Sequence, residues 1–242
     1  MTSTPTVHSF YRYNIEPRVL AAQQSVFDHL GVPLRQWRDD KQTHAGWMDE
    51  LLADDSLDDI FVVADIDAFP LTYAAYEWIV GEAEKGAIVG LAQTTNEKRP
   101  DKIFAAPMFL AFRRDVFKAL GAPTMHPYDE GDVAQILTDL APQHGVDVVL
   151  KYPTFALRPR WALADRGVYG TGTFYGDNEF FHLYASRMRN TADLFCAVAE
   201  GAVAGTHDYD AYLKIIEDKP DLKTGRSLSQ ILRKLRGRMR AT

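Results

Sequence analysis

An alternation of strand-like and helix-like segments runs through the first 94 residues and constrains the fold more than any other feature. The strand-like segments are 7–15, 32–37, 59–65 and 87–94, and the helix-like segments between them are 17–31, 44–54 and 70–86. Pro17 suits the first position of a helix, and Gly31 suits the residue that follows its end. Repeated strand–helix units predict an α/β fold in which a mainly parallel sheet is flanked by helices.

The second half of the chain has a less regular pattern. It predicts strands at 104–112 and 146–152 and helices at 113–121 and 131–145. The glycine-rich segment 169–176, YGTGTFYG, is interpreted as a mobile loop rather than a dinucleotide cradle, because its glycines do not sit between a buried strand and a helix. At least two helices are expected after this segment.

Composition is that of an ordinary globular protein, since 46% of the 242 residues are hydrophobic and 25% are charged. The first residues lack a signal-peptide pattern, and no apolar run approaches the roughly 20 residues that span a bilayer, so a cytoplasmic location is expected. The single cysteine, Cys196, excludes an internal disulfide. The net charge is −6, although the segment from Lys223 onward has seven Lys or Arg and no acid. The rest of the chain is therefore strongly acidic, which argues against nucleic-acid binding as the main function.

Two aspartates, Asp65 and Asp67, follow the most apolar strand in the stretch VVADIDAFP. Side chains alternate along a strand, so both carboxylates face the same side, with Cα atoms roughly 6–7 Å apart if the strand continues. Acids this close repel each other unless a proton or a cation intervenes, and a divalent cation prefers such oxygen ligands. Pro70 is expected to open the next helix, which makes Phe69 its cap and leaves neither acid as a cap. The alternative is that both acids are ordinary loop or capping residues.

This arrangement resembles the GT-A fold of nucleotide-sugar glycosyltransferases, over residues 7 to 190 and as architecture rather than close identity. In that family, strand–helix units end in an Asp-x-Asp pair that binds Mn²⁺ or Mg²⁺ and, through the ion, the donor diphosphate. The resemblance implies that Asp65 and Asp67 are metal ligands. It also implies that residues 1–190 form a GT-A-like catalytic domain and that 191–242 form a helical C-terminal extension.

The same resemblance implies a nucleotide-binding role for residues that follow the first strand, namely Tyr11, Arg12, Tyr13 and Asn14. An aromatic ring can stack on a base and an asparagine can hydrogen-bond its edge. Packing within the strand is the alternative for the two tyrosines.

Other residues take sugar-site or metal-site roles from the resemblance. The acid that contacts sugar hydroxyls or acts as catalytic base corresponds to one of Asp129, Glu130 and Asp132. The alternative is that these acids only complement the dipole of a following helix. His182 corresponds to an additional metal ligand, although a lone histidine in an aromatic strand is commonly structural. Asn96 and Lys102 lie where such folds build the sugar and acceptor pocket, and Lys102 would either meet phosphate as a point charge or stay solvated.

The function that the resemblance implies is metal-dependent transfer of a sugar from a nucleotide-diphosphate donor, with a UDP-sugar favoured, to an unidentified hydroxyl acceptor. One alternative is a haloacid-dehalogenase-like phosphatase, in which the first aspartate is a nucleophile. Its pattern continues with Thr or Val where this chain has Phe69. A second alternative is a non-catalytic GT-A-like binding module.

The last segment has the pattern of a basic amphipathic helix. Its apolar residues follow helical spacing and are Leu228, Ile231, Leu232, Leu235 and Met239. Contact with an anionic membrane surface is one interpretation. The other is packing of the apolar stripe on the acidic body of the chain or on a second subunit, which would make a homo-oligomer.

Overall fold

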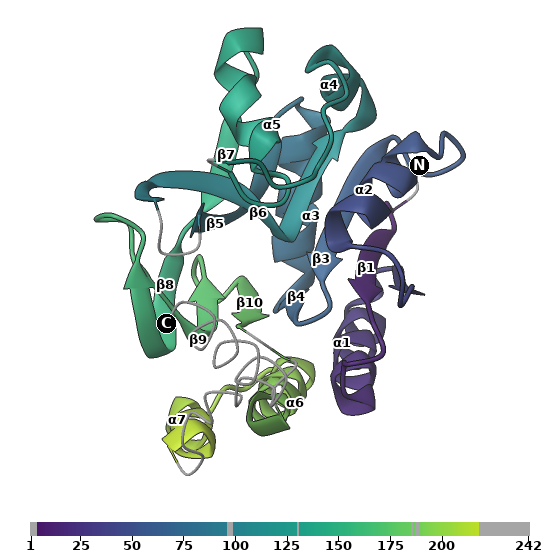
Figure 1. The fold of residues 1–242 in the computed structure, drawn as a ribbon. Helices are drawn as coiled ribbons and strands as arrows, with labels where there is room; N and C mark the ends of the chain where they lie inside the picture. Colours follow the sequence, from purple (N-terminus) through teal and green to yellow (C-terminus); the bar gives the residue numbers. More distant parts are fainter. Residues whose placement is uncertain (1–3, 96–98, 130, 185, 187–188, 218–242) are drawn as a thin grey trace, which may run out of the picture.

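The structure is a computed structural model that describes residues 4–95, 99–129, 131–184, 186 and 189–217. The larger sheet has the order β2-β1-β3-β6-β5-β7, with β2 (Leu34–Arg38), β1 (Val7–Tyr11), β3 (Ile60–Asp65), β6 (Arg99–Arg113), β5 (Ile88–Thr95) and β7 (Val148–Lys151) (Figure 1). The smaller sheet has the order β4-β10-β9-β8, with β4 (Ala68–Pro70), β10 (Phe180–Leu183), β9 (Val168–Tyr175) and β8 (Pro153–Ala162). The helices are α1 (Pro17–Leu30), α2 (His44–Ala53), α3 (Tyr73–Glu84), α4 (Arg114–Ala119), α5 (Gln135–Leu140), the 3-10 helix η1 (Ala141–His144), α6 (Arg189–Ala204) and α7 (Tyr209–Glu217).

The larger sheet is mostly parallel. Strand β1 pairs in parallel with β2 and β3, and β7 pairs in parallel with β5, whereas β6 runs antiparallel to β3 and β5. This topology confirms the predicted α/β class. Helix α1 begins at Pro17 and is followed by Gly31, whose φ of 67° is readily adopted by glycine, as the sequence predicts.

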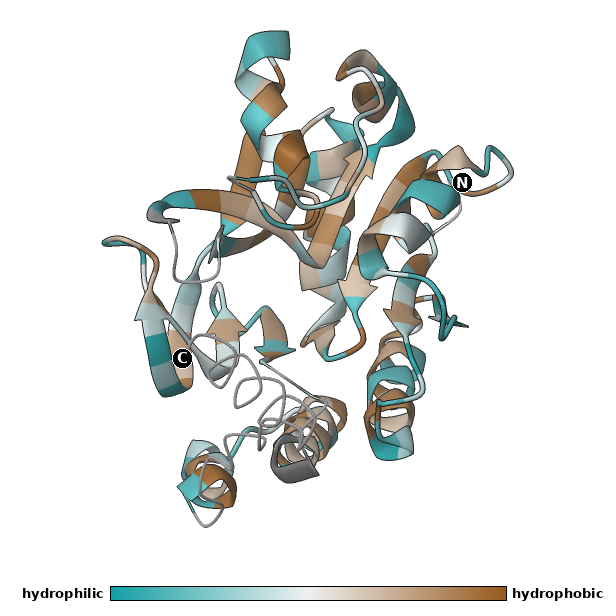
Figure 2. Ribbon diagram, in the orientation of Figure 1, coloured by the Kyte–Doolittle hydropathy of each residue, from teal (hydrophilic) through white to brown (hydrophobic). Residues whose placement is uncertain are grey.

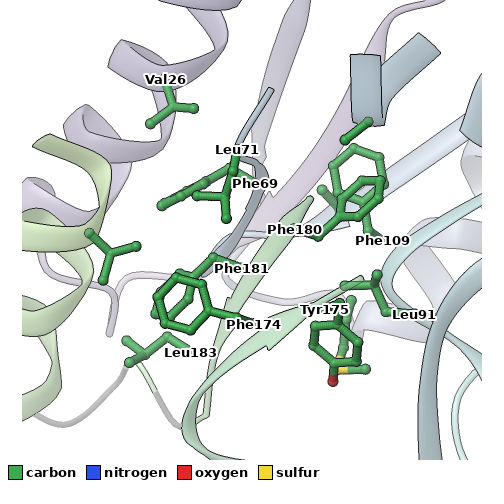
Figure 3. Close-up of a cluster of buried hydrophobic side chains, with 14 of the residues drawn as sticks. Val26, Phe69, Leu71, Leu91, Phe109, Phe174, Tyr175, Phe180, Phe181 and Leu183 are labelled. Carbon is green, nitrogen blue, oxygen red and sulfur yellow. The ribbon is translucent and has the colours of Figure 1, made fainter. Parts of the chain in front are cut away.

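Alternate residues of β3 face two separate cores. Phe61 and Val63 belong to a cluster with α2, α4 and α5, while Val62 and Ala64 belong to a cluster with α1 and α3. Figure 2 shows hydrophobic residues concentrated in the central strands of the larger sheet. The second cluster continues into the smaller sheet and α6, where the aromatic side chains of Phe69, Phe174, Phe180 and Phe181 are buried (Figure 3). Both faces of β3 are therefore covered, as expected for a strand with a continuous apolar run.

The prediction that Pro70 opens a helix is wrong. Residues Ala68–Pro70 form β4, which pairs with β10 so that Phe69 lies opposite Phe181, and α3 begins at Tyr73. The N-cap is Thr72, whose side chain accepts a hydrogen bond from the backbone N–H of Ala75 at 3.1 Å. A local helix-start signal at Pro70 is overridden by pairing with a strand that is distant in the sequence.

The prediction that residues 169–176 form a mobile loop is also wrong, because most of them belong to strand β9 between β8 and β10. The glycines permit close packing rather than mobility. A Cβ at Gly170 would lie 2.5 Å from the carbonyl oxygen of Leu157 on β8. A Cβ at Gly172 would lie 3.1 Å from side-chain atoms of Leu194 and Phe181. Glycine within a strand commonly marks such a close approach.

The helix predicted over 131–145 is shorter in the structure, where α5 begins at Gln135 and gives way to η1 at Ala141. Ala134 has a φ of 61°, which is incompatible with a helix that continues through it. The Gln135 side chain stabilises the start of α5, since its Oε1 accepts hydrogen bonds from Asp132 N at 3.1 Å and from Thr95 Oγ1 at 2.7 Å.

Helices α6 and α7 pack against the same hydrophobic cluster as β3, through side chains that include Leu194, Phe195 and Tyr212. The division of the chain at residue 190 stays a prediction. Asn96, Glu130 and the predicted basic helix within 223–242 lie outside the described residues. In the part of the chain that is described, no helix has the length and apolar character needed to cross a membrane.

Candidate metal and nucleotide site

Asp65 and Asp67 lie where the chain passes from one sheet to the other. Asp65 ends β3 of the larger sheet, and Asp67 immediately precedes β4 of the smaller sheet. A fully buried glutamine from α1, Gln23, holds this crossover, because its Nε2 donates hydrogen bonds to the carbonyl oxygens of Asp65 and Ala68, each at 2.9 Å. Gln36 in turn donates to Gln23 Oε1 at 3.0 Å. These hydrogen bonds hold the backbone of the segment that carries both aspartates.

Strand β10 brings His182 to the two aspartates. His182 lies opposite Ala68 in the antiparallel β4–β10 pair. Its Nε2 is 3.5 Å from Asp65 Oδ2 and 3.5 Å from Asp67 Oδ1. Asp67 and His182 are buried, and Asp65 is partly exposed. One ligand atom from each of the three residues lies within 4.8 Å of the other two, and we call these residues the Asp-Asp-His cluster.

A buried tyrosine on β9 orients the histidine. The hydroxyl of Tyr169 is 2.9 Å from His182 Nδ1, so the other ring nitrogen, Nε2, faces the carboxylates. Burial lowers the pKa of His182, but hydrogen bonds to Asp65 and Asp67 outweigh this effect and raise the pKa to about 9. Burial raises the pKa of Tyr169 well above its usual value, so its hydroxyl stays protonated. The neighbouring carboxylates therefore favour the protonated form of the His182 imidazole.

The Asp-Asp-His cluster fits a divalent cation such as Mn²⁺ or Mg²⁺. Two carboxylate oxygens and one imidazole nitrogen converge, a donor set that suits Mn²⁺ and, through its oxygens, Mg²⁺. The Nδ1 of a metal-ligating histidine usually has its own hydrogen-bond partner, and Tyr169 supplies one here. The role of these residues as metal ligands stays a prediction.

A cavity of about 330 Å³, which we call the polar cavity, opens beside the cluster at the end of β1. Of the four residues predicted there, Tyr11, Arg12 and Asn14 line this cavity, together with Asp65 and Asp67. Arg12 Nη2 donates a hydrogen bond to the carbonyl oxygen of Asp40 at 2.8 Å. Tyr13, the fourth residue, is 71% exposed and is not among the lining residues. The structure therefore brings three of the four to the aspartates.

A second cavity of about 200 Å³, which we call the aromatic cavity, also borders Asp65. Its lining includes His182, Tyr169, Tyr184 and Phe104. Asp132 also lines it, whereas Asp129 is exposed and is not part of its lining. Lys102 lies on β6, two residues before Phe104, and does not line the cavity either.

His44, which the sequence pattern did not single out, lines both cavities together with Asp65. It is the first residue of α2, and its Nδ1 is 3.6 Å from Asp65 Oδ1. Its ring stacks on Phe10, with centroids 6.0 Å apart and planes inclined by 6°. Gln23 was missed as well, although a glutamine within the apolar stripe of a helix signals a buried polar contact. Tyr169 gave no signal that distinguishes it from a packing residue of a strand.

No family model and no curated protein matches the sequence. Among solved structures, the chain is similar to one described as a nucleotide-diphospho-sugar transferase from Desulfovibrio desulfuricans, with a TM-score of 0.42 and 11% identity over 62% of this chain and 80% of that one. The catalytic domain of Drosophila β1,4-galactosyltransferase 7, in complex with xylobiose, gives a TM-score of 0.40 and 11% identity over 60% of this chain and 64% of that one. Protein A197 from STIV gives a TM-score of 0.42 and 9% identity over 74% and 94%. Likeness at this level does not identify a substrate or a reaction.

Proposed function

We propose that the protein is a metal-dependent glycosyltransferase that moves a sugar from a nucleotide-diphosphate donor to a hydroxyl acceptor. The observation that supports this function is the position of the Asp-Asp-His cluster, because Asp65 belongs to it and also lines both the polar and the aromatic cavity. A donor that spans the two cavities would carry its diphosphate past the cluster. The cluster would then act on the bond between the diphosphate and the sugar.

The polar cavity suits the nucleoside part of the donor. Tyr11 offers an aromatic face to a base, and Asn14 offers a donor and an acceptor for the edge of the base. Arg12 adds a permanent positive charge near the path of the phosphates. These three residues follow the first strand of the sheet, where the carboxyl ends of parallel strands commonly form ligand sites.

Asp65, Asp67 and His182 would hold the cation. When bound, the ion supplies Lewis-acid stabilisation of the negative charge that develops on the leaving diphosphate. Tyr169 keeps the Nε2 of His182 directed at the carboxylates, and Gln23 keeps the turn that carries them in place. We assign the role of sugar-hydroxyl contact or catalytic base to Asp132, because Asp132 lines the aromatic cavity whereas Asp129 is exposed and does not.

The test is a binding and product assay on the full chain. Isothermal titration with UDP, GDP and their hexose conjugates, each with Mn²⁺ and with EDTA, is expected to show nucleotide binding that depends on the metal. Incubation with the best donor is expected to release the nucleoside diphosphate as the sugar passes to a hydroxyl acceptor or, where none is added, to water. No metal-dependent binding of any nucleotide would overturn the proposal, and so would release of pyrophosphate from a nucleoside triphosphate in place of sugar transfer.

A further inference from the structure

The aromatic cavity contains a polar side chain, Gln93, that has no role in the function proposed above. Gln93 lies on β5, opposite Phe104 of β6, and its side chain lines the cavity together with Asp65 and His182. It is only partly buried. A group bound at this end of the Asp-Asp-His cluster would therefore meet the amide of Gln93.

Two hydrogen bonds determine which end of the Gln93 amide faces the cavity. Its Oε1 accepts from the indole Nε1 of Trp161 at 3.1 Å and from the backbone N–H of Thr94 at 2.9 Å. Both partners are donors, so the oxygen must face them and the nitrogen must face the opposite way. Among the described residues, the acceptor near Nε2 is the thioether sulfur of Met108 at 3.9 Å, which is a weak acceptor. Gln93 therefore offers amide N–H donors to the cavity.

The Trp161 ring that fixes this orientation is itself firmly packed. It stacks on Tyr169 with centroids 4.6 Å apart and meets Tyr184 edge-on at 5.5 Å. Tyr169 is the residue that orients His182. One aromatic group thus positions both the proposed metal ligand and the amide of Gln93.

The walls of the aromatic cavity define the chemistry of an occupant. Gln93 offers an N–H donor, Asp132 offers carboxylate oxygens, and the aromatic side chains of Tyr169 and Tyr184 add apolar surface. A saturated ring with hydroxyl groups matches this lining, because each hydroxyl both donates and accepts and the C–H groups are apolar. A site built to hydrogen-bond a hydroxyl discriminates strongly against an isomer that places the hydroxyl elsewhere, because the site's own polar groups are then left unpaired.

We infer that Gln93 is a specificity-determining residue for the transferred sugar and that Trp161 is its positioning residue, an inference that rests on the function proposed above. The Gln93 amide donates a hydrogen bond to one sugar hydroxyl and thereby selects sugars that have a hydroxyl at that position. Trp161 acts through Gln93 by preventing rotation of the amide. Neither residue contacts the nucleotide part of the donor.

The test compares wild type with Gln93→Glu and Gln93→Leu by isothermal titration in Mn²⁺, using UDP, UDP-glucose, UDP-galactose, GDP and GDP-mannose. Glutamate keeps acceptors for Trp161 and Thr94 but has no N–H, and leucine keeps the volume without either group. We expect wild type to prefer one nucleotide sugar over its epimer or over the other sugars. Gln93→Leu should lower this preference about 5- to 10-fold, the effect of losing one hydrogen bond, and leave the affinity for UDP or GDP within about twofold. Gln93→Glu replaces the N–H donor with a charged acceptor and should change the preference as well.

Trp161→Phe keeps an aromatic ring at this position but removes the indole N–H, so it should lower the preference less than the Gln93 variants. Gln24→Leu, the same chemical change on the exposed side of α1, is the control and should change nothing. If wild type binds no nucleotide in Mn²⁺, the proposed function itself fails. If wild type binds but does not discriminate between sugars, or if folded Gln93→Leu retains the full preference, the inference about Gln93 is overturned.

Discussion

Strand β3 carries a pair of acidic residues at each end, and the two pairs differ in what surrounds them. Asp58 and Asp59 precede the strand, whereas Asp65 is its last residue and Asp67 lies in the crossover to β4. The larger cavity, of about 530 Å³, lies at the first pair and is lined by Asp58, Asp59, Glu84, Arg113 and Asp115, among others. The smaller cavities lie at the second pair. Cavity volume alone would therefore choose the end of the strand opposite the site that we propose.

The first pair is engaged in holding the fold together. A carboxylate oxygen of Asp58 accepts a hydrogen bond from the backbone N–H of Thr6 at 2.8 Å. The carbonyl oxygens of Asp58 and Asp59 accept from the side chain and the backbone N–H of Arg114, at 2.8 and 2.9 Å. Among the described residues, the Asp-Asp-His cluster is where three potential ligands converge. An acid pair becomes a candidate metal site when a second strand delivers the third ligand.

The largest expected effect comes from removing one carboxylate at the second pair. Asp67→Asn keeps the size of the side chain and removes its charge. Loss of an outer-shell partner of a metal site costs about 10- to 100-fold in affinity, so nucleotide binding in Mn²⁺ should weaken by more than this when a ligand itself is changed. Isothermal titration measures this change. Asp58→Asn makes the same substitution at the other end of β3 and should leave nucleotide binding unchanged. Equal effects of the two variants, or full binding by folded Asp67→Asn, would break the comparison.

The next effect concerns the buried side chains that hold the two ends of the strand. Gln23→Leu leaves the carbonyl oxygens of Asp65 and Ala68 without their donor, which should lower the free energy of unfolding by about 2–3 kcal/mol. It should also weaken Mn²⁺-dependent nucleotide binding, because the turn carries the aspartates. Arg114→Met removes a buried hydrogen-bond donor to the carbonyl oxygen of Asp58, at the other end of β3. It should lower the free energy of unfolding without changing the affinity of the folded protein for nucleotide. Urea unfolding and titration separate these results, and unchanged nucleotide affinity in Gln23→Leu would contradict the role of the turn.

A smaller effect is expected from the tyrosine whose hydroxyl contacts His182, Tyr169. Tyr169→Phe removes the hydroxyl that orients His182 and should lower Mn²⁺ affinity about 10-fold, as for other outer-shell partners. The matched control is Tyr175→Phe on the same strand, whose buried hydroxyl contacts the sulfur of Met108 at 3.8 Å rather than His182. Electron paramagnetic resonance of free Mn²⁺ gives the affinity without an activity assay. An equal loss in both variants would show that the change is a packing effect.

The last effect, gradual in pH, concerns another buried histidine, His8. Burial lowers the pKa of His8 from 6.5 to about 4, and nearby Arg35 and Arg114 add to the shift while Asp58 opposes it. Between pH 6.5 and 4 the unfolded chain therefore binds a proton that the folded protein does not. This difference should remove at most about 1.4 kcal/mol of stability for each pH unit of acidification.

The measurement is urea unfolding of wild type and His8→Gln at several pH values from 7.5 to 4.5. The variant should lose stability less steeply below pH 6.5, because glutamine does not titrate. Above pH 7 the free energy of unfolding should depend on pH in the same way for both proteins, because His8 is neutral in the folded and the unfolded chain. Parallel curves throughout would contradict the lowered pKa of His8.

The sequence by itself determined the fold class and the location of the acid pair. Both depend on short-range regularities, namely the alternation of strands and helices and the two-residue period of side chains in a strand. The strand that ends at Asp65 and the helix that starts at Pro17 are visible in this way, within a residue or so. The cap at Gly31 follows from the conformational freedom of glycine, which is also local.

The tertiary structure decided which other residues join that pair. His182 meets the aspartates because β10 pairs with β4 in one particular register, and a shift by one residue would turn its side chain to the opposite face. The same pairing converts Pro70 from an expected helix start into a strand residue. Packing likewise separates Asp132 from Asp129, and Tyr11 from Tyr13, although each pair looks alike in the sequence. Contacts between segments far apart in the chain depend on how whole elements pack, so no local pattern of residues specifies them.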